Sequence, residues 1–366
     1  MGRTTGAAEA SEPKKSDGTD RARHTRRRTH GWRRALLATL ITGAVVVPLS
    51  GAARPEIPAP APAAVAAPVT SVTLDEAYAA NRANAAEASR MAAAHGNRER
   101  AAADRAMADP SRHFLTFDGR GLGLATEVFG DLAHADRIAV LVPGSDTSID
   151  TYDRFREAAG ALHERLGREA PQGTRTAVVA WLGYETPATV STTVATAGRA
   201  EEAAPKLREF IRQLRALTEN SGRYEPGART DGKPTGSPHR RPHISLLCHS
   251  YGSVVCGRAA SDLDVDDIAL IGSPGTGADT ATALHTPARV WAGRGSDDWV
   301  AEVPHIEIDL LGTTVGFGTD PVSPSFGARV FAAGGGGHSD YFRPGSTSLA
   351  NLTRIVLGET SEVTHG

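Results

Sequence analysis

The stretch HISLLCHSYGSVV (243–255) contains the features that decide the fold. Its first part, HISLLC (243–248), is a short apolar run of the kind found in a strand that is buried on both faces of a parallel sheet. A short turn with Ser250 follows, and a helical pattern starts beyond Gly252. Similar apolar runs and helical patterns alternate on both sides, so we expect an α/β fold with a mostly parallel central sheet and helices on both faces.

The other expected strands are also apolar runs that end in a turn. They cover 137–144, 176–183, 267–275, 288–295 and 328–335, after a leading pair at 113–117 and 123–129. Helical patterns cover 148–165, 197–218 and 346–357, the last with Gly358 just past its end. The polar Gly/Pro-rich stretch 219–242 has the composition of a surface loop. Together these elements predict one α/β domain over 113–360.

The sequence before this domain changes composition three times. We divide it into a disordered basic region (1–34), an apolar segment (35–53), a Pro/Ala-rich linker (54–72) and a helical extension (73–112). In the extension, Thr73 and Glu76 have the spacing of a capping box at a helix start. Gly96 is expected to break the extension into two helices.

The apolar segment has the layout of an export signal. Residues 21–34 are rich in arginine, 35–49 (ALLATLITGAVVVPL) carry no charge, and small residues follow up to Ala53. A retained membrane anchor is the alternative, although the run is shorter than the roughly 20 residues of a full span. We therefore expect an extracytoplasmic protein, either secreted or associated with the membrane through residues 35–50.

Charge and cysteine content limit the remaining possibilities. The formal net charge is −2, and export explains the basic run, so we expect no nucleic-acid partner. The chain has only two cysteines, Cys248 and Cys256, too few for a disulfide framework or a zinc site. In an exported chain this pair is expected either to form one disulfide or to remain as two small buried thiols.

The turn after the 243–248 strand matches the context of a nucleophilic serine. A strand, a sharp turn with Ser250 and a following helix would expose the hydroxyl and set it at the positive end of the helix dipole. Such a turn requires small neighbours, and Gly252 meets this requirement two residues later. Cys248 replaces the glycine that usually lies two residues before the serine.

A serine nucleophile needs a base, and His338 is the best candidate. His338 follows four consecutive glycines (334–337) after the last expected strand, where a base belongs in the chain order serine, acid, histidine. His305 is the alternative. His249 adjoins Ser250, but a histidine at that position commonly has another role.

The acid is expected after the 288–295 strand, where two aspartates compete. We prefer Asp297, because an aspartate with a valine three residues later is the more familiar pattern there, and Asp298 is the alternative. The backbone N–H groups of Tyr251 and Ser145 are the expected oxyanion-hole donors. This chemistry requires no metal or organic cofactor.

The three motifs together resemble a known family. Over about 113–358 the sequence resembles the α/β-hydrolase superfamily, and within it an actinobacterial family of largely unassigned substrate. The resemblance rests on HSYGS (249–253), GSDD (295–298) and GHSDYF (337–342). It implies the α/β-hydrolase fold and a Ser-His-Asp triad, and it leaves the substrate open.

The expected activity is hydrolysis of a carboxylic ester or a related acyl bond, on a small-molecule or lipid-like substrate. No large apolar lid insertion is present, which favours esters of small or moderate size. Two alternatives remain open. One is acyl transfer to a cell-envelope acceptor, and the other is a catalytically silent binding module of the same fold.

Overall fold

A computed structural model describes residues 57–64, 69–189, 196–221, 241–303, 307–310 and 313–366. Residues 56–366 form one compact unit. The predictions for residues 1–34 and 35–53, and most of the predicted loop at 219–242, lie outside the described residues. Within the described ranges, no helix has both the length and the apolar character that a membrane span requires.

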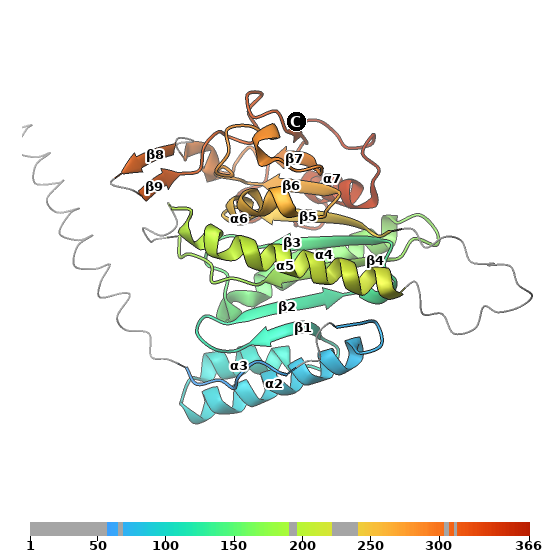
Figure 1. Cartoon of the computed structure of the whole chain (residues 1–366), viewed down its shortest axis with the longest axis vertical. Helices are drawn as coiled ribbons and strands as arrows, with labels where there is room; N and C mark the ends of the chain where they lie inside the picture. Colours follow the sequence, from blue (N-terminus) through green and yellow to red (C-terminus); the bar gives the residue numbers. More distant parts are fainter. Residues whose placement is uncertain (1–56, 65–68, 190–195, 222–240, 304–306, 311–312) are drawn as a thin grey trace, which may run out of the picture. The chain divides into compact units, whose positions relative to one another are not determined.

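The core of this unit is an eight-stranded sheet in the order β1-β2-β4-β3-β5-β6-β7-β10 (Figure 1). The β1–β2 and β2–β4 pairs are antiparallel, and all the other pairs are parallel. The strands are β1 (His113–Asp118), β2 (Leu124–Phe129), β3 (Arg137–Val142), β4 (Thr176–Leu182), β5 (His243–His249), β6 (Asp267–Ile271), β7 (Arg289–Gly293) and β10 (Arg329–Val330). This arrangement confirms the predicted α/β class.

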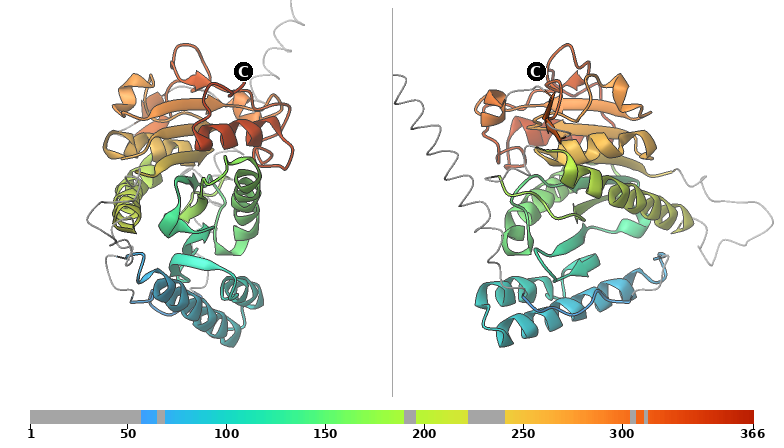
Figure 2. Two further views of the ribbon diagram at one scale, coloured as in Figure 1. Left: turned by 90° about the vertical axis from the view of Figure 1, so that its right-hand side faces the viewer. Right: turned by 60° about the vertical axis from the view of Figure 1, so that its left-hand side comes forward.

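Helices cover both faces of the sheet (Figure 2). One face packs against α5 (Gly198–Ser221) and α6 (Gly252–Ala259), and the other against α4 (Tyr152–Glu169) and α7 (Thr347–Leu357). Successive strand residues point to opposite faces. Val140 of β3 therefore joins the α5/α6 core and Leu141 joins the α4/α7 core. Since both faces are buried, the strands are continuously apolar in sequence.

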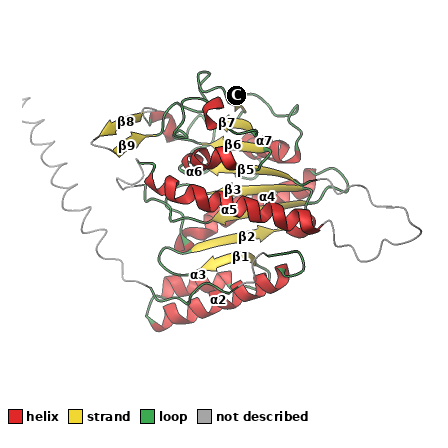
Figure 3. Ribbon diagram, in the orientation of Figure 1, coloured by secondary structure: helices red, strands yellow, loops and turns green. Residues whose placement is uncertain are grey.

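The helical extension packs on the first edge of the sheet (Figure 3). It consists of α2 (Leu74–Ala94) and α3 (Arg98–Met107), and alanines of α2 share a small core with Phe114 and Phe117 of β1. The predicted capping box is absent. The backbone of Thr73 is not extended, and its hydroxyl hydrogen-bonds to Thr70 instead of to the helix.

One segment differs from the prediction in a way that positions the site. Of the strand expected at 328–335, only Arg329–Val330 pairs with β7. Phe331 N–H still donates to Ala292 O of β7 at 2.9 Å, and Phe331 also forms a bridge with His365 near the C-terminus. Beyond this point the chain continues as the loop that carries His338. The antiparallel hairpin of β8 (Glu307–Leu310) and β9 (Thr313–Gly316) is separate from the main sheet.

Candidate active site

Ser250 occupies a sharp turn between β5 and α6. Its φ of 54° lies in the left-handed region, which a non-glycine residue seldom adopts. The turn is held by two backbone hydrogen bonds: Ser250 N–H donates to Ile271 O at 2.9 Å, and Ser253 N–H donates to Ser250 O at 2.9 Å. The serine is 9% exposed and faces a pocket. This geometry matches the strained strand-to-helix turn predicted for a nucleophile.

Two glycines allow the close approach that this turn requires. A Cβ atom on Gly252 would lie 2.6 Å from Val142 O and 2.7 Å from Pro143 O. A Cβ atom on Gly144 would lie 2.6 Å from Ser250 Cβ. Any larger residue at either position would collide with atoms that cannot easily move. The predicted need for a small residue at Gly252 is therefore explained by the loop after β3.

Cys248 and Cys256 form a disulfide that joins the end of β5 to α6, with Cα atoms 6.4 Å apart. Both residues are fully buried in the core beneath α5 and α6. The bridge therefore decides between the two alternatives left open by the sequence. It also explains the unusual Cys248, because the side chain points into the core where it is linked to the helix.

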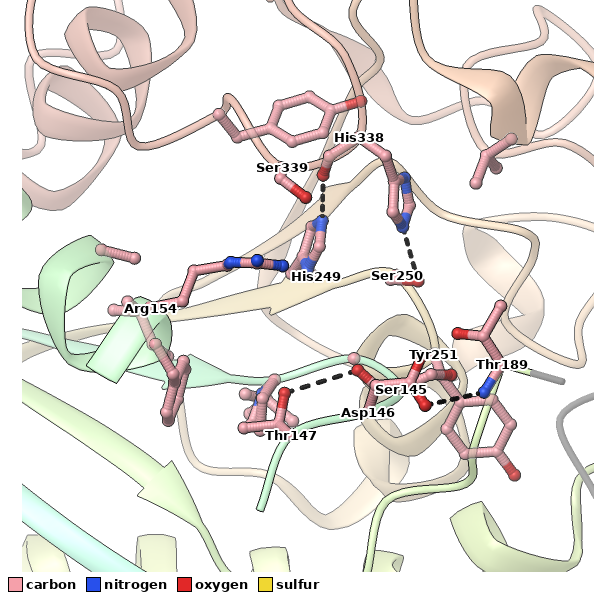
Figure 4. Close-up of a pocket in the computed structure, with 18 of the residues that line it drawn as sticks. Ser145, Asp146, Thr147, Arg154, Thr189, His249, Ser250, Tyr251, His338 and Ser339 are labelled. Atoms are coloured by element: carbon pink, nitrogen blue, oxygen red, sulfur yellow. Dashed lines mark hydrogen bonds between the residues drawn. The ribbon is translucent and has the colours of Figure 1, made fainter. Parts of the chain in front are cut away.

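Ser250, His338 and Asp298 form a continuous hydrogen-bonded chain. His338 Nε2 lies 2.9 Å from Ser250 Oγ, and His338 Nδ1 lies 2.9 Å and 3.0 Å from the two oxygens of Asp298 (Figure 4). An ionised carboxylate only accepts hydrogen bonds, so Nδ1 carries the proton and Nε2 is free to accept the serine proton. The arrangement can therefore activate the hydroxyl for nucleophilic attack.

The preference for Asp297 as the acid is wrong on this geometry. Asp297 is exposed, and its carboxylate contacts only the neighbouring Ser296 hydroxyl at 3.2 Å. Asp298 instead precedes a short 3₁₀ helix (Trp299–Glu302) and accepts the Val300 N–H at 2.9 Å. This capping bond turns the carboxylate of Asp298 inward toward His338, whereas the side chain before it points to solvent.

Tyr341 provides a further support for the acid that the sequence analysis missed. Its hydroxyl donates a hydrogen bond to Asp298 Oδ2 and accepts one from Gly295 N–H at 3.0 Å. Burial raises the pKa of Asp298, but hydrogen bonds from His338, Tyr341 and the Val300 backbone outweigh it and hold that pKa below its usual value. Burial also raises the pKa of Tyr341, which keeps its hydroxyl a donor. Asp298 is thus ionised at neutral pH.

As predicted from the sequence, His249 does not occupy the position of the general base. Its Nε2 lies 2.8 Å from the His338 carbonyl, and since a carbonyl only accepts, this nitrogen carries the proton (Figure 4). Burial, together with the nearby His338, lowers the pKa of His249 to about 4. The ring is therefore neutral at pH 7 and holds the loop that carries His338 in place.

These groups open into a pocket of about 1100 Å³. Its apolar walls include Phe155, Ala158, Leu247, Val300, Phe317 and Phe342. Trp299 is 51% exposed at the pocket, and its ring centroid lies 4.7 Å from that of His338. Ser145 and Tyr251, the predicted oxyanion-hole residues, both line the pocket beside Ser250, and their role stays a prediction.

Two other possibilities were raised by the sequence, His305 as the base and a metal site. His305, the alternative base, lies outside the described residues. In the part of the chain that is described, no three His, Cys, Asp or Glu side chains come together as metal ligands. The site as described is thus built from Ser250, His338 and Asp298 with their supporting hydrogen bonds.

The chain is similar in sequence to a protein family and to a known relative. A family model described as alpha/beta hydrolase matches residues 118–225 and 232–308, together about half of the chain. The uncharacterized protein Rv2079 of Mycobacterium tuberculosis is 27% identical over 266 residues, which cover 65% of this chain and 37% of the relative. The chain therefore spans well under half of the length of that relative.

Two solved structures are similar at lower sequence identity. The crystal structure of esterase PE8 has a TM-score of 0.39 and 17% identity, and the match covers 65% of this chain and 99% of that chain. XC6422 from Xanthomonas campestris, described as an a/b serine hydrolase without lid, has a TM-score of 0.39 and 16% identity. That match covers 69% of this chain and 95% of the other.

Proposed function

Because the chain belongs to the α/β-hydrolase family, we propose that it is a serine hydrolase that cleaves a carboxylic ester or a related acyl bond. Ser250 is the proposed nucleophile, His338 the general base and Asp298 the acid. The observation that carries the proposal is the hydrogen-bonded chain from Ser250 Oγ through His338 to Asp298, with each step at 2.9 Å. The strained turn at Ser250 supports it as well.

In the proposed reaction Ser250 Oγ attacks the acyl carbon while His338 Nε2 accepts the hydroxyl proton. Asp298 stabilises the imidazolium ion that forms. The negative oxygen of the tetrahedral intermediate accepts hydrogen bonds from the backbone N–H groups of Tyr251 and Ser145, each worth about 3 kcal/mol in such sites. His338 then donates its proton to the leaving group, whose bond to the acyl carbon breaks. In the second half a water molecule attacks the acyl carbon while His338 Nε2 accepts its proton, and His338 returns that proton to Ser250 Oγ as the bond from Ser250 to the acyl carbon breaks and the acid is released.

The pocket supports a wider range of substrates than the sequence indicated. Its volume of about 1100 Å³ lies at the upper end of small-molecule sites, and apolar side chains form much of its wall. Esters of moderate to large size, including lipid-like ones, therefore fit the proposal.

A fluorophosphonate probe tests the nucleophile directly, because it forms a covalent bond with an activated serine. We expect the full chain to gain the mass of one probe on the peptide that contains Ser250, and to hydrolyse a series of p-nitrophenyl esters. Ser250→Ala is expected to lose both, whereas Ser261→Ala, which changes an exposed serine on the surface, retains both. Equal labelling of the Ser250→Ala variant, or no labelling and no turnover in the wild type, would refute the proposal and favour a silent binding module.

We also propose that the protein acts outside the cytoplasm. The basic and apolar order of residues 21–49 supports export. The Cys248–Cys256 disulfide supports an oxidising compartment, because such bonds are rare in cytosolic proteins. Thiol titration of the denatured, unreduced protein purified from a culture medium or an envelope fraction is the test. We expect no free thiol and no protein in the cytosolic fraction, and recovery of a reduced protein from the cytosol alone would contradict the proposal.

A further inference from the structure

Arg154 is the one arginine or lysine among the described residues that line the pocket. It lies in the first turn of α4, directly before Phe155 of the apolar wall. Figure 4 shows its side chain extending from the helix toward His249. A full positive charge thus faces a pocket with many apolar lining residues, on the side of His249.

The other arginines of α4 show that Arg154 is exceptional. Arg156 pairs with Glu127, Arg165 with Glu169 and Arg168 with Glu164. Arg154, by contrast, takes part in none of the ion pairs or side-chain hydrogen bonds of the described residues. The three paired arginines do not line the pocket. On this helix the arginine without a counter-charge is therefore the one that faces the substrate space.

None of the three carboxylates that line the pocket forms an ion pair with Arg154. Asp150, one turn before Arg154, is paired with the buried Arg100 through two contacts of 2.6 Å and 2.9 Å. Asp146 accepts the Thr189 N–H at 3.0 Å, and in Figure 4 it lies beside Ser145, away from Arg154. Asp153 also lines the pocket and forms no ion pair with Arg154. The positive charge of Arg154 next to His249 is therefore not held in an ion pair with any of the three carboxylates that line the pocket.

A second donor lies on the same wall. Ser339 follows His338 and lines the pocket, and its hydroxyl has no hydrogen-bond partner among the described residues. In Figure 4 the side chains of Arg154 and Ser339 are both drawn next to His249. A guanidinium group offers a planar pair of N–H donors that fits a carboxylate, and a hydroxyl adds one more donor.

We propose that Arg154, assisted by Ser339, binds a carboxylate carried by the substrate, so that the preferred substrates are monoanionic esters. The inference rests on the proposed hydrolase function. One unpaired cation matches one negative charge, which favours a carboxylate over a phosphate dianion. We place the carboxylate away from the scissile bond, because Arg154 lines the pocket on α4 and takes no part in the hydrogen bonds of Ser250, His338 and Asp298.

Matched ester pairs test this specificity in the full chain. One pair is 4-nitrophenyl butyrate and the 4-nitrophenyl monoester of glutarate, which differ by a carboxylate on the acyl half. The other is the butyrate of methyl 4-hydroxybenzoate and the butyrate of 4-hydroxybenzoate, which differ on the leaving group. We expect kcat/KM to be about 10- to 100-fold higher for the anionic member of one pair, the size of one charge-assisted hydrogen bond.

Arg154→Met should abolish that preference and leave kcat/KM for the neutral esters within about 2-fold of the wild type. The reason is that the lost Coulomb attraction acts only on the anionic substrates. Arg168→Met is the matched control, since it removes an arginine from the same helix at a position outside the pocket. It should retain the wild-type preference. Equal kcat/KM for the charged and neutral members of both pairs, or a preference that persists in Arg154→Met, would overturn the proposal.

A binding measurement separates this proposal from the hydrolase proposal. Ser250→Ala removes turnover but keeps the pocket, so the affinity for monomethyl glutarate and for neutral dimethyl glutarate can be compared by calorimetry. We expect tighter binding of the monoanion, and loss of that difference in Ser250→Ala/Arg154→Met. If both ligands bind equally, Arg154 has no such role, whatever the outcome of the probe labelling.

Discussion

Asp298→Asn is expected to lower kcat for ester hydrolysis by about 10⁴-fold, the loss found when the acid of such a triad becomes an amide. The carboxylate accepts the Nδ1 proton of His338 at 2.9 Å, which leaves Nε2 unprotonated toward Ser250. An amide that offers its NH₂ group to Nδ1 favours the opposite tautomer, with the proton on Nε2. His338 is then unable to accept the proton of Ser250, although the geometry of the site is kept.

Asp297→Asn is the matched control, because it makes the same chemical change one residue earlier on an exposed side chain. Its kcat should stay within about 3-fold of the wild type, as for a surface change away from the reacting groups. Steady-state kinetics on one p-nitrophenyl ester, with far-UV circular dichroism to verify folding, measure both. A large loss in Asp297→Asn with a small one in Asp298→Asn would restore the original preference from the sequence.

Sequence reasoning was strongest for the strands that are buried on both faces. β3, β4, β5 and β6 are continuous apolar runs, and a run of this kind has few other uses in a chain of this composition. β10 was overestimated, because ARVFAAGG (328–335) is as apolar as the others. The strand ends at Val330, and the residues that follow it contact the C-terminal segment near His365, a contact between distant parts of the chain that leaves no local signal.

The same difference between local and long-range information explains which residues of the site could be predicted from the sequence. Ser250 and His338 were found because a strand–turn–helix and a glycine tract are local patterns. The choice between Asp297 and Asp298 depends on which carboxylate a short 3₁₀ helix turns inward, which neighbouring residues do not reveal. Tyr341 lay within a recognised motif, three residues after His338, but its contact with Asp298 becomes apparent only when the two loops meet.

Asp267→Asn is expected to cost about 3 kcal/mol of folding stability, the lower end of the loss when one partner of a buried ion pair is removed. Asp267 starts β6 and is fully buried. Its carboxylate accepts hydrogen bonds from His243 Nε2 at 2.7 Å, Arg289 Nε at 2.7 Å and Trp291 Nε1 at 2.8 Å. An amide presents an N–H group to some of these donors and leaves Arg289 without a counter-charge.

Urea unfolding at pH 7 measures this effect, with Asp262→Asn as the control. Asp262 is 68% exposed in its contact with Arg208, so its loss should cost less than about 1 kcal/mol. A cost of the same small size for Asp267→Asn would show that the cluster adds nothing to stability. The proposed ester hydrolysis should be retained in Asp267→Asn, because the cluster lies where β5, β6 and β7 begin, whereas Ser250 follows the end of β5.

The stability difference between wild type and Asp267→Asn should change with pH in a definite direction. Burial raises the pKa of Asp267, but the hydrogen bonds from His243, Arg289 and Trp291 outweigh it and hold that pKa below its usual value. The unfolded chain has an ordinary aspartate pKa of about 3.9, so the contribution of Asp267 is fully present above that pH and is lost as the pH falls through the lower pKa of the folded state. The asparagine side chain does not titrate. The stability gap between wild type and Asp267→Asn should therefore narrow as the pH falls below about 4, and a gap that widens there would contradict an ionised Asp267 in the fold.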